Sequence, residues 1–305
     1  MSKRTACLFG AAFILSGSGS AFAADIAVKA AAPSPAPVYN WTGWYAGVNA
    51  GASFGTVKTD VNGAPIFWTQ PGVSGQITPG FGFSDQTYPA AFIGGGQIGY
   101  NWQYSPLIVA GLEADFQGSG ERDGGTNFSQ FNFLGTGACG VPTGVSTSPC
   151  TSNTSYTTQL DWFGTVRARI GYLFGDGAVL TYVTGGLAYG EVKINGTNTV
   201  SGTFSIPGTG SFSPFSLTQA FDHSNVNTGW VIGSGTEGKL LIPGWTYKIE
   251  GLYMDLGHLD ATSVRSGASV ANAPSLTNFL QGGQVTTHSH FTDTILRLGV
   301  NYQFH

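Results

Sequence analysis

Eight stretches of alternating apolar and polar residues place the strongest constraint on the fold of this chain, which has no long apolar run beyond its first 23 residues. The clearest stretch spans residues 160–172. Successive side chains of a β-strand point to opposite faces, so this stretch has one apolar and one polar face. Only helices and closed barrels satisfy every backbone hydrogen bond in lipid, and the pattern therefore predicts a membrane β-barrel. The expected lipid-facing side chains are Leu160, Trp162, Val166, Ala168, Ile170 and Tyr172.

The N-terminus has the pattern of an export signal. Lys3 and Arg4 precede an apolar stretch at residues 6–15, and residues 21–23 offer a small-x-small cleavage site. We therefore expect residues 1–23 to be a signal peptide, because the apolar part is too short to span a bilayer as a helix.

Composition indicates one envelope domain behind this signal. Residues 24–40 are rich in Ala and Pro and predict an extended periplasmic tether, and residues 41–305 suffice for one outer-membrane barrel with four long outer loops. Removing Lys3 and Arg4 takes the formal net charge from −4 to −6. This mild acidity and the scattered basic residues argue against nucleic-acid binding.

The expected fold is all-β, an eight-stranded antiparallel up-and-down transmembrane barrel. Short and long connections alternate, and bacterial barrels have short periplasmic turns and long outer loops, so both termini are expected in the periplasm. Residues 199–219 are predicted to form a loop hairpin with arms of about seven residues, shorter than the roughly 9–11 needed to cross, although ten strands are the alternative. The expected strands are residues 44–56, 90–104, 107–118, 158–174, 179–192, 226–240, 245–256 and 292–304.

Aromatic residues support this threading, because they fall into two belts of the kind that flanks a bilayer. The periplasmic belt is expected to contain Trp44, Tyr100, Trp102, Tyr172, Phe174, Trp245, Tyr247, Tyr302 and Phe304. The outer belt is expected to contain Phe54, Phe92, Phe116, Trp162, Tyr189, Trp230 and Tyr253.

Charged residues of the strands are expected inside the barrel, because a Lys or Arg at mid-membrane on the lipid face costs about 2–4 kcal/mol. An eight-stranded barrel is only wide enough for its side chains to fill it. The near balance of acids and bases favours a paired ladder that plugs the lumen, and the alternative is the selectivity filter of an open pore. The expected lumen charges are Glu113, Asp115, Asp161, Arg167, Arg169, Glu237, Lys239, Lys248, Glu250, Asp293 and Arg297.

Cysteine and histidine suggest no catalytic site. Cys139 and Cys150 share one predicted outer loop in an oxidising compartment, which predicts a disulfide and leaves no metal-ligand or nucleophile role. Ser289 lies between His288 and His290, and alternation points it away from both, although a nucleophilic serine must lie within hydrogen-bond reach of its base. Loop histidines in solvent are the simplest interpretation, with a weak metal or haemin site at His258, His288 and His290 as the alternative.

Several segments together resemble the RopB-type outer-membrane immunogenic protein family of alphaproteobacteria, small barrels of the OmpA-like class. The resemblance covers the strands from about Asn40 to Phe304, and His305 departs from the terminal Phe usual in such barrels. It is carried by residues 40–51 (NWTGWYAGVNAG), 96–103 (GQIGYNWQ), 111–115 (GLEAD), 161–172 (DWFGTVRARIGY), 182–190 (YVTGGLAYG) and 296–304 (LRLGVNYQF).

The resemblance implies an integral outer-membrane protein with a structural, envelope-integrity and surface-antigen role, and no enzymatic activity or cofactor. A porin-like diffusion channel for small hydrophilic solutes is the first alternative, and haemin or host-surface binding by the outer loops is the second. Outer-membrane lipids, lipopolysaccharide and the outer-membrane assembly machinery are the expected partners.

Overall fold

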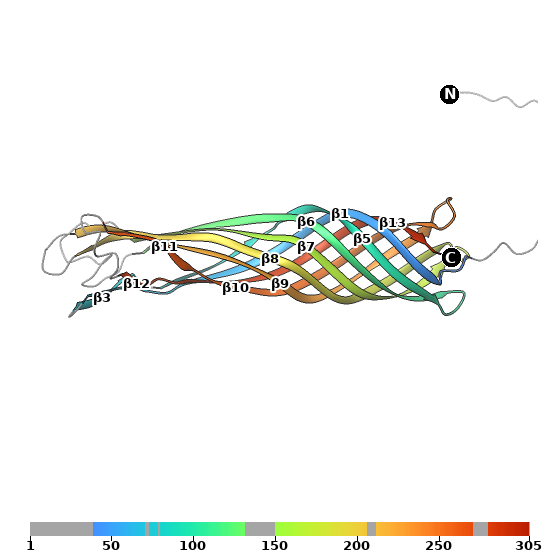
Figure 1. Ribbon diagram of the computed structural model, residues 1–305, viewed down its shortest axis with the longest axis horizontal. Helices are drawn as coiled ribbons and strands as arrows, with labels where there is room; N and C mark the ends of the chain where they lie inside the picture. The colour runs from blue at the N-terminus through green and yellow to red at the C-terminus, as the bar shows by residue number, and fades with distance from the viewer. Residues whose placement is uncertain are drawn as a thin grey trace, which may run out of the picture. The chain divides into compact units, whose positions relative to one another are not determined.

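The computed structural model describes residues 39–70, 73–78, 80–131, 150–205, 212–270 and 280–304. Within them, eight long antiparallel strands close into one ring, in which β9 pairs with β10 and β1 pairs with β13 (Figure 1). The predicted eight-stranded up-and-down barrel is confirmed, and the ten-stranded alternative is wrong. The ring strands are β1 (Gly43–Gly63), β5 (Ala90–Gln103), β6 (Ile108–Phe131), β7 (Cys150–Phe174), β8 (Val179–Ser205), β9 (Phe212–Lys239), β10 (Trp245–Thr262) and β13 (Val285–Gln303).

Five short strands lie in the long connections. β4 (Phe81–Thr87) pairs with β1 beyond β5, and β11 (Val264–Val270) pairs with β9. β2 (Ile66–Gln70), β3 (Val73–Thr78) and β12 (Leu280–Gly282) form a separate small sheet.

One end of the barrel, here called the turn end, holds the three tight turns, the start of β1 and the end of β13 (Figure 1). The turn between β7 and β8 needs residues in the left-handed region: Gly175, Asp176 and Gly177 have φ of 58°, 54° and 82°. Gly244 before β10 has φ 80° for the same reason. The opposite end, where the long connections lie, is called the loop end.

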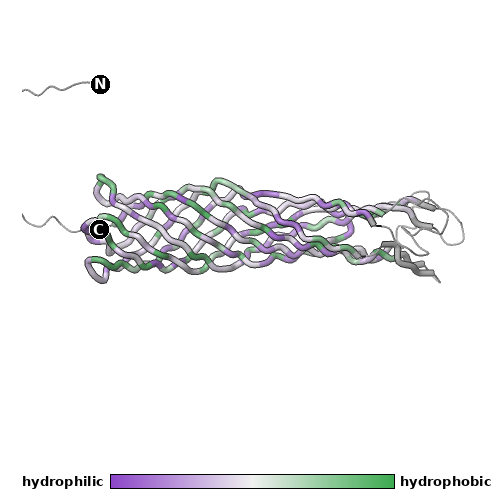
Figure 2. Tube along the Cα trace, turned by 180° about the vertical axis from the view of Figure 1, so that it is seen from behind, coloured by the Kyte–Doolittle hydropathy of each residue, from purple (hydrophilic) through white to green (hydrophobic). Residues whose placement is uncertain are grey.

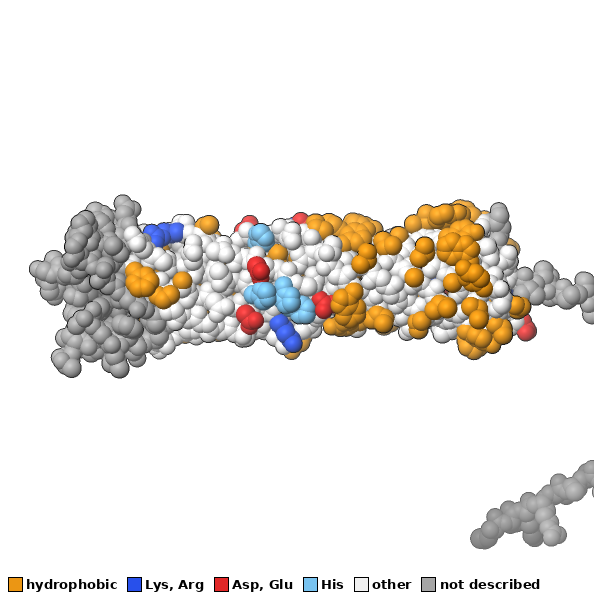
Figure 3. Space-filling model, turned by 90° about the horizontal axis from the view of Figure 1, so that it is seen from below, with side chains coloured by type: hydrophobic (Ala, Val, Ile, Leu, Met, Phe, Trp, Pro, Cys, Tyr) orange, Lys and Arg blue, Asp and Glu red, His pale blue; other side chains and the backbone are white. Residues whose placement is uncertain are grey.

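Two belts of aromatic side chains circle the wall, as predicted. At the turn end, Trp44 packs on Tyr100 with ring centroids 5.3 Å apart, and Trp245 packs on Tyr302 at 5.5 Å. The second belt includes stacked Phe116 and Trp162, with centroids 5.4 Å apart. Between the belts the exposed side chains are aliphatic, including Val48, Ile98, Leu112, Ile170 and Leu298. Figure 3 shows, on one face of the molecule, hydrophobic side chains gathered over the turn-end half of the wall.

The strands continue far beyond the second belt, and several are about twice as long as a membrane crossing requires. The predicted strands were therefore too short at the loop end. The predicted arms, residues 199–205 and 212–219, do pair antiparallel, but they continue β8 and β9 without interruption, out to Ser205 and Phe212.

The polarity of the barrel reverses along its length. Between the belts, polar side chains point inward and apolar ones outward, which gives the alternating colours in Figure 2. Above the second belt, apolar side chains point inward and form a hydrophobic core, as in a water-soluble barrel. The described part of the chain contains no helix with the length and hydropathy that a bilayer crossing needs.

Candidate functional site

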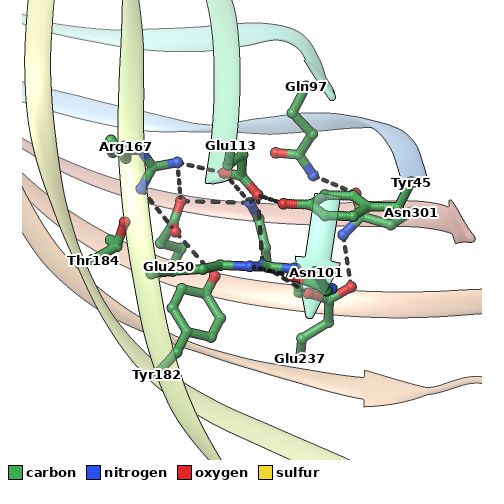
Figure 4. A network of polar contacts seen from close by, with 12 residues as sticks. Tyr45, Gln97, Asn101, Glu113, Arg167, Tyr182, Thr184, Glu237, Glu250 and Asn301 are labelled. Atoms are coloured by element: carbon green, nitrogen blue, oxygen red, sulfur yellow. Dashed lines mark hydrogen bonds and ion pairs between the residues drawn. The ribbon is translucent and has the colours of Figure 1, made fainter. Parts of the chain in front are cut away.

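The barrel interior between the belts is filled by a network of four acids and four bases, here called the central network. Its members are Glu113, Asp115, Glu237, Glu250, Arg167, Arg169, Lys248 and Arg297, each no more than 4% exposed. They come from five strands and are joined across the lumen by hydrogen bonds and ion pairs (Figure 4).

Arg167 lies at the centre of this network. It contacts Glu113 on the neighbouring strand β6 at 2.5 Å, and Asp115 on the same strand at 2.9 Å. It also reaches Glu250 on the distant strand β10, with Nη1 to Oε1 at 2.9 Å. Its planar fork lets one side chain bind three carboxylates. Arg167 therefore ties opposite walls of the barrel together.

Lys248 and Arg297 complete the upper layer. Lys248 Nζ lies 2.8 Å from Glu113 Oε1. Arg297 Nη2 lies 2.6 Å from Glu250 Oε2 and 2.8 Å from Asp115 Oδ2. Each of the three carboxylates thus has at least two cationic neighbours, which is how charges become tolerable away from water.

Arg169 forms a lower layer toward the turn end. Its guanidinium lies 3.1 Å from Glu237 and donates to the side-chain oxygen Oδ1 of Asn101. It also lies over the rings of Tyr45 and Tyr182, 4.6 and 5.1 Å from their centroids. The two tyrosine hydroxyls donate upward to Glu113 and Glu250, which links the two layers.

The turn-end mouth is closed by Tyr39 and Trp41, here called the turn-end seal, which sequence reasoning missed. Trp41 is 1% exposed, packs against Leu173 and Leu180, and donates from Nε1 to the Gly177 carbonyl oxygen at 2.9 Å. Tyr39 donates to Gln303 Oε1 at 2.6 Å. Burial and the charge of Glu237 raise the pKa of Tyr39 to about 12, so its hydroxyl keeps its proton as a donor.

Replacing Trp41 by phenylalanine is expected to lower the free energy of unfolding by about 1–2 kcal/mol, because the Gly177 carbonyl loses its buried donor. Urea titration of the barrel in lipid vesicles measures this change. Trp44→Phe is the control, because Trp44 is exposed on the outer wall and lacks such a bond. Equal unfolding curves for both variants would show that the hydrogen bond from Trp41 to Gly177 does not stabilise the barrel.

Above the central network the interior contains an apolar cluster, here called the loop-end core, beside buried polar side chains such as Gln117 and Ser289. Phe163 is completely buried and packs there with Val192, Met254 and Leu256. The core also contains Val57, Ile93, Tyr156, Leu160, Ala188, Ile194, Phe221, Val231, Leu252, Leu259, Ala261, Phe291 and Ile295.

Two of the eleven expected lumen charges lie elsewhere. Asp161 is on the outer wall, where it accepts a hydrogen bond from Lys193 at 2.6 Å. A β-bulge between Leu160 and Trp162 adds one residue to β7, so alternation reverses there and Leu160 turns inward. Lys239 lies at the turn-end rim with Nζ 4.2 Å from the Tyr39 ring centroid.

Asp293 is buried in the lumen, but it does not join the central network. Ser53 Oγ donates to Asp293 Oδ2 at 2.5 Å and also contacts Glu121, an interior acid that sequence reasoning missed. Glu121 was missed because the predicted strand ended at Gly118, whereas β6 continues to Phe131.

The cysteines and histidines are partly described. Cys150 is disulfide-bonded, but Cys139 lies outside the described residues, so their pairing stays a prediction. Ser289 is buried inside the barrel and His288 is exposed outside, as alternation predicted. Among the described residues, no group of three or more His, Cys, Asp or Glu is arranged to hold a metal ion.

Comparison with known proteins gives consistent matches. Residues 9–304 match the family model described as outer membrane protein beta-barrel domain. The chain is 33% identical over 295 residues to the 31 kDa outer-membrane immunogenic proteins of Brucella melitensis and Brucella suis, covering 93% of this chain and 94% of each relative.

Solved structures with a similar arrangement are more distant. The outer membrane protease OmpT of Escherichia coli is 10% identical with a TM-score of 0.29, covering 85% of this chain and 97% of that one. Ail, the attachment invasion locus protein of Yersinia pestis, is 12% identical with a TM-score of 0.23, covering 82% of this chain and 98% of that one. At these scores neither likeness bears on function.

Proposed function

Because this chain belongs to the outer membrane protein beta-barrel family, we propose that it is a structural protein of the outer membrane whose closed barrel carries surface-exposed antigenic loops. The central network is the observation that carries the proposal. Four acids and four bases, all buried and mutually paired, occupy the lumen between the two aromatic belts. A solute path there would have to separate charges that are already paired.

Two further features of the barrel interior support a structural role. The turn-end seal occupies one mouth, and the loop-end core occupies part of the interior above the network together with buried polar side chains. Paired charges and apolar packing both join strands that are far apart around the ring, so they stabilise the barrel. The proposal includes no catalysis, and the Brucella relatives are named as immunogenic proteins.

The proposal places the turn end in the periplasm and the loop end outside the cell. Short turns on the periplasmic side and long outer connections are the usual arrangement of bacterial barrels. The polarity reversal agrees with this orientation, because the apolar-outside half is the part that fits into lipid. The upper half, polar outside and apolar inside, would then stand in water as a stalk that presents the loops.

The channel and haemin alternatives have less support. A diffusion channel needs a continuous polar path, and the loop-end core interposes apolar side chains. For haemin, His258, His288 and His290 do come together, but their rings lie face to face, with interplanar angles of 20° and 13°. Ring nitrogens in parallel planes do not converge on one metal centre.

Planar-bilayer recording tests the proposal. We expect barrels whose folding is verified by different gel mobility before and after boiling to give no steady conductance. An open porin recorded in the same membranes shows that insertion and detection work. Salt-dependent steps from the wild-type barrel that change in Arg167→Ala and Glu113→Ala would overturn the closed-lumen proposal in favour of a channel.

A further inference from the structure

Three histidines form a stack on the outer wall of the barrel, here called the histidine stack: His258 on β10, and His288 and His290 on β13. The His258 ring centroid lies 4.6 Å from that of His288 and 4.4 Å from that of His290. Figure 3 shows histidine side chains gathered in one patch beside the hydrophobic band. The ring of His258 therefore contacts both of the other imidazoles on this outer surface.

A β-bulge brings His258 to this surface. The register between β10 and β13 shifts between Asp255 and Gly257, and Gly257 adopts φ of 72°. Below the bulge the even-numbered residues of β10 point inward, as Met254 and Leu256 do. The extra residue reverses this order, so His258 faces outward beside His290, its direct neighbour across the strands.

The position of the stack is fixed relative to the lipid-facing belt on the same three strands. Phe54, Thr294 and Tyr253 form one row across β1, β13 and β10, and the first and last belong to the belt. His290 lies four residues from this row toward the loop end of β13, about 13 Å along the strand at 3.3 Å per residue. With the usual strand tilt of about 35–45°, this is about 10 Å along the barrel axis. In the proposed orientation this height corresponds to the headgroups of the outer leaflet.

Charged side chains on the neighbouring strands surround the histidine stack. On β1, Lys58 lies opposite His290 in the strand register, and Asp60 lies opposite His288. On β10, Asp260 contacts His288 Nδ1, and Asp255 Oδ1 lies 3.0 Å from His290 Nε2. β9 pairs with β10 only up to Asp255 and carries the exposed Asp222 and His223 further along. From β4, Ser84 donates to Asp60, and Asp85 points inward to Tyr156.

Protonation of the three histidines would reverse the charge of this patch. Lys58 with Asp60, Asp255 and Asp260 sums to −2, and three imidazolium groups bring the sum to +1. Histidine is the side chain that changes charge in the mildly acidic range. The carboxylates occupy one ring nitrogen of His288 and one of His290, and the other nitrogen of each has no partner among the described residues.

We propose that the histidine stack is a proton-gated site for the phosphate groups of outer-leaflet glycolipids, bound when the imidazoles are charged and released when they are neutral. Imidazolium N–H groups donate short charge-assisted hydrogen bonds to phosphate. The phosphate source is the lipid, because the stack lies directly above the lipid-facing belt. The site adds a lipid partner and a pH response to the proposed structural role, and it rests on that role only through the orientation in the membrane.

Titration with lipid A in detergent, at about pH 5.5 and about pH 7.5, tests the site without relying on orientation or conductance. For wild type we expect affinity to be at least about tenfold higher at the lower pH, because the phosphate then meets charged donors. The triple variant His258→Asn, His288→Asn, His290→Asn should lose this pH dependence. His223→Asn, an exposed histidine outside the stack, should keep it.

Two further binding measurements make the result of the titration decisive. His288→Arg carries a permanent charge and should raise the affinity at about pH 7.5, which remains readable even if the triple variant folds poorly. Lipid A without its phosphates should bind without pH dependence. The proposal is wrong if the triple variant keeps the wild-type pH response, if wild type shows none, or if inorganic phosphate alone binds as tightly as lipid A.

Discussion

Replacing Arg167 by alanine is expected to destabilise the barrel by about 3–5 kcal/mol, the usual cost of removing one partner from a buried ion pair. The expected loss is large because Arg167 binds Glu113, Asp115 and Glu250 simultaneously. After the substitution these three buried carboxylates keep only Lys248, Arg297 and the more distant Arg169. Urea titration in lipid vesicles measures the loss, and the folded band on unboiled gels should disappear at a lower temperature.

Two control variants distinguish the loss of the buried ion-pair network from the loss of a positive charge in general. Lys193→Ala removes a cation that pairs with Asp161 on the outer wall, and it should barely change stability, since solvent screens exposed pairs. Arg167→Lys keeps the charge but not the fork that reaches three carboxylates, so its stability should fall between wild type and Arg167→Ala. If Arg167→Ala unfolds at the wild-type urea concentration, the lumen charges do not hold the walls together.

The membrane half of the fold could be predicted because lipid imposes a strict rule on each strand. Only apolar side chains are tolerated outside, so alternation identified the strands, the belts and the charges that had to point inward. Arg167 and Glu113 are examples, and they lie side by side on β7 and β6. The sequence did not specify which acid meets which base, because partners such as Glu250 and Arg167 are distant along the chain and meet only when the ring closes.

The loop-end half of the barrel was not predicted, because its strands do not follow the pattern of apolar side chains outside and polar side chains inside. Beyond the second belt the outward side chains are polar, so the apolar-outside signal ends although the strands continue. Bulges also shift alternation without a clear sequence mark: one at Asp161 sends that acid outward, and one at Gly257 brings His258 beside the other histidines. Trp41 was missed because it precedes the first strand and shows no alternation at all.

Replacing Phe163 by alanine is expected to cost about 3–5 kcal/mol, which is typical for truncating a buried aromatic side chain. Phe163 is completely buried in the loop-end core, immediately above the level of Arg167 on the same strand. Its removal would leave a cavity between rigid strands that cannot move inward to fill it. Phe128→Ala is the matched control, because Phe128 lies on the adjacent strand β6 and is 66% exposed.

The Phe163 and Arg167 variants together test whether the two halves of the barrel are stabilised by opposite chemistry. Raising the salt concentration should leave the loss in Phe163→Ala unchanged, because apolar packing carries no charge to screen. If Phe163→Ala and Phe128→Ala unfold alike, the upper interior is not a packed core, and the upper strands would need another source of stability. If Phe163→Ala is destabilised yet still gives no conductance, the loop-end core is not needed to close the lumen, which the central network and the turn-end seal still occupy.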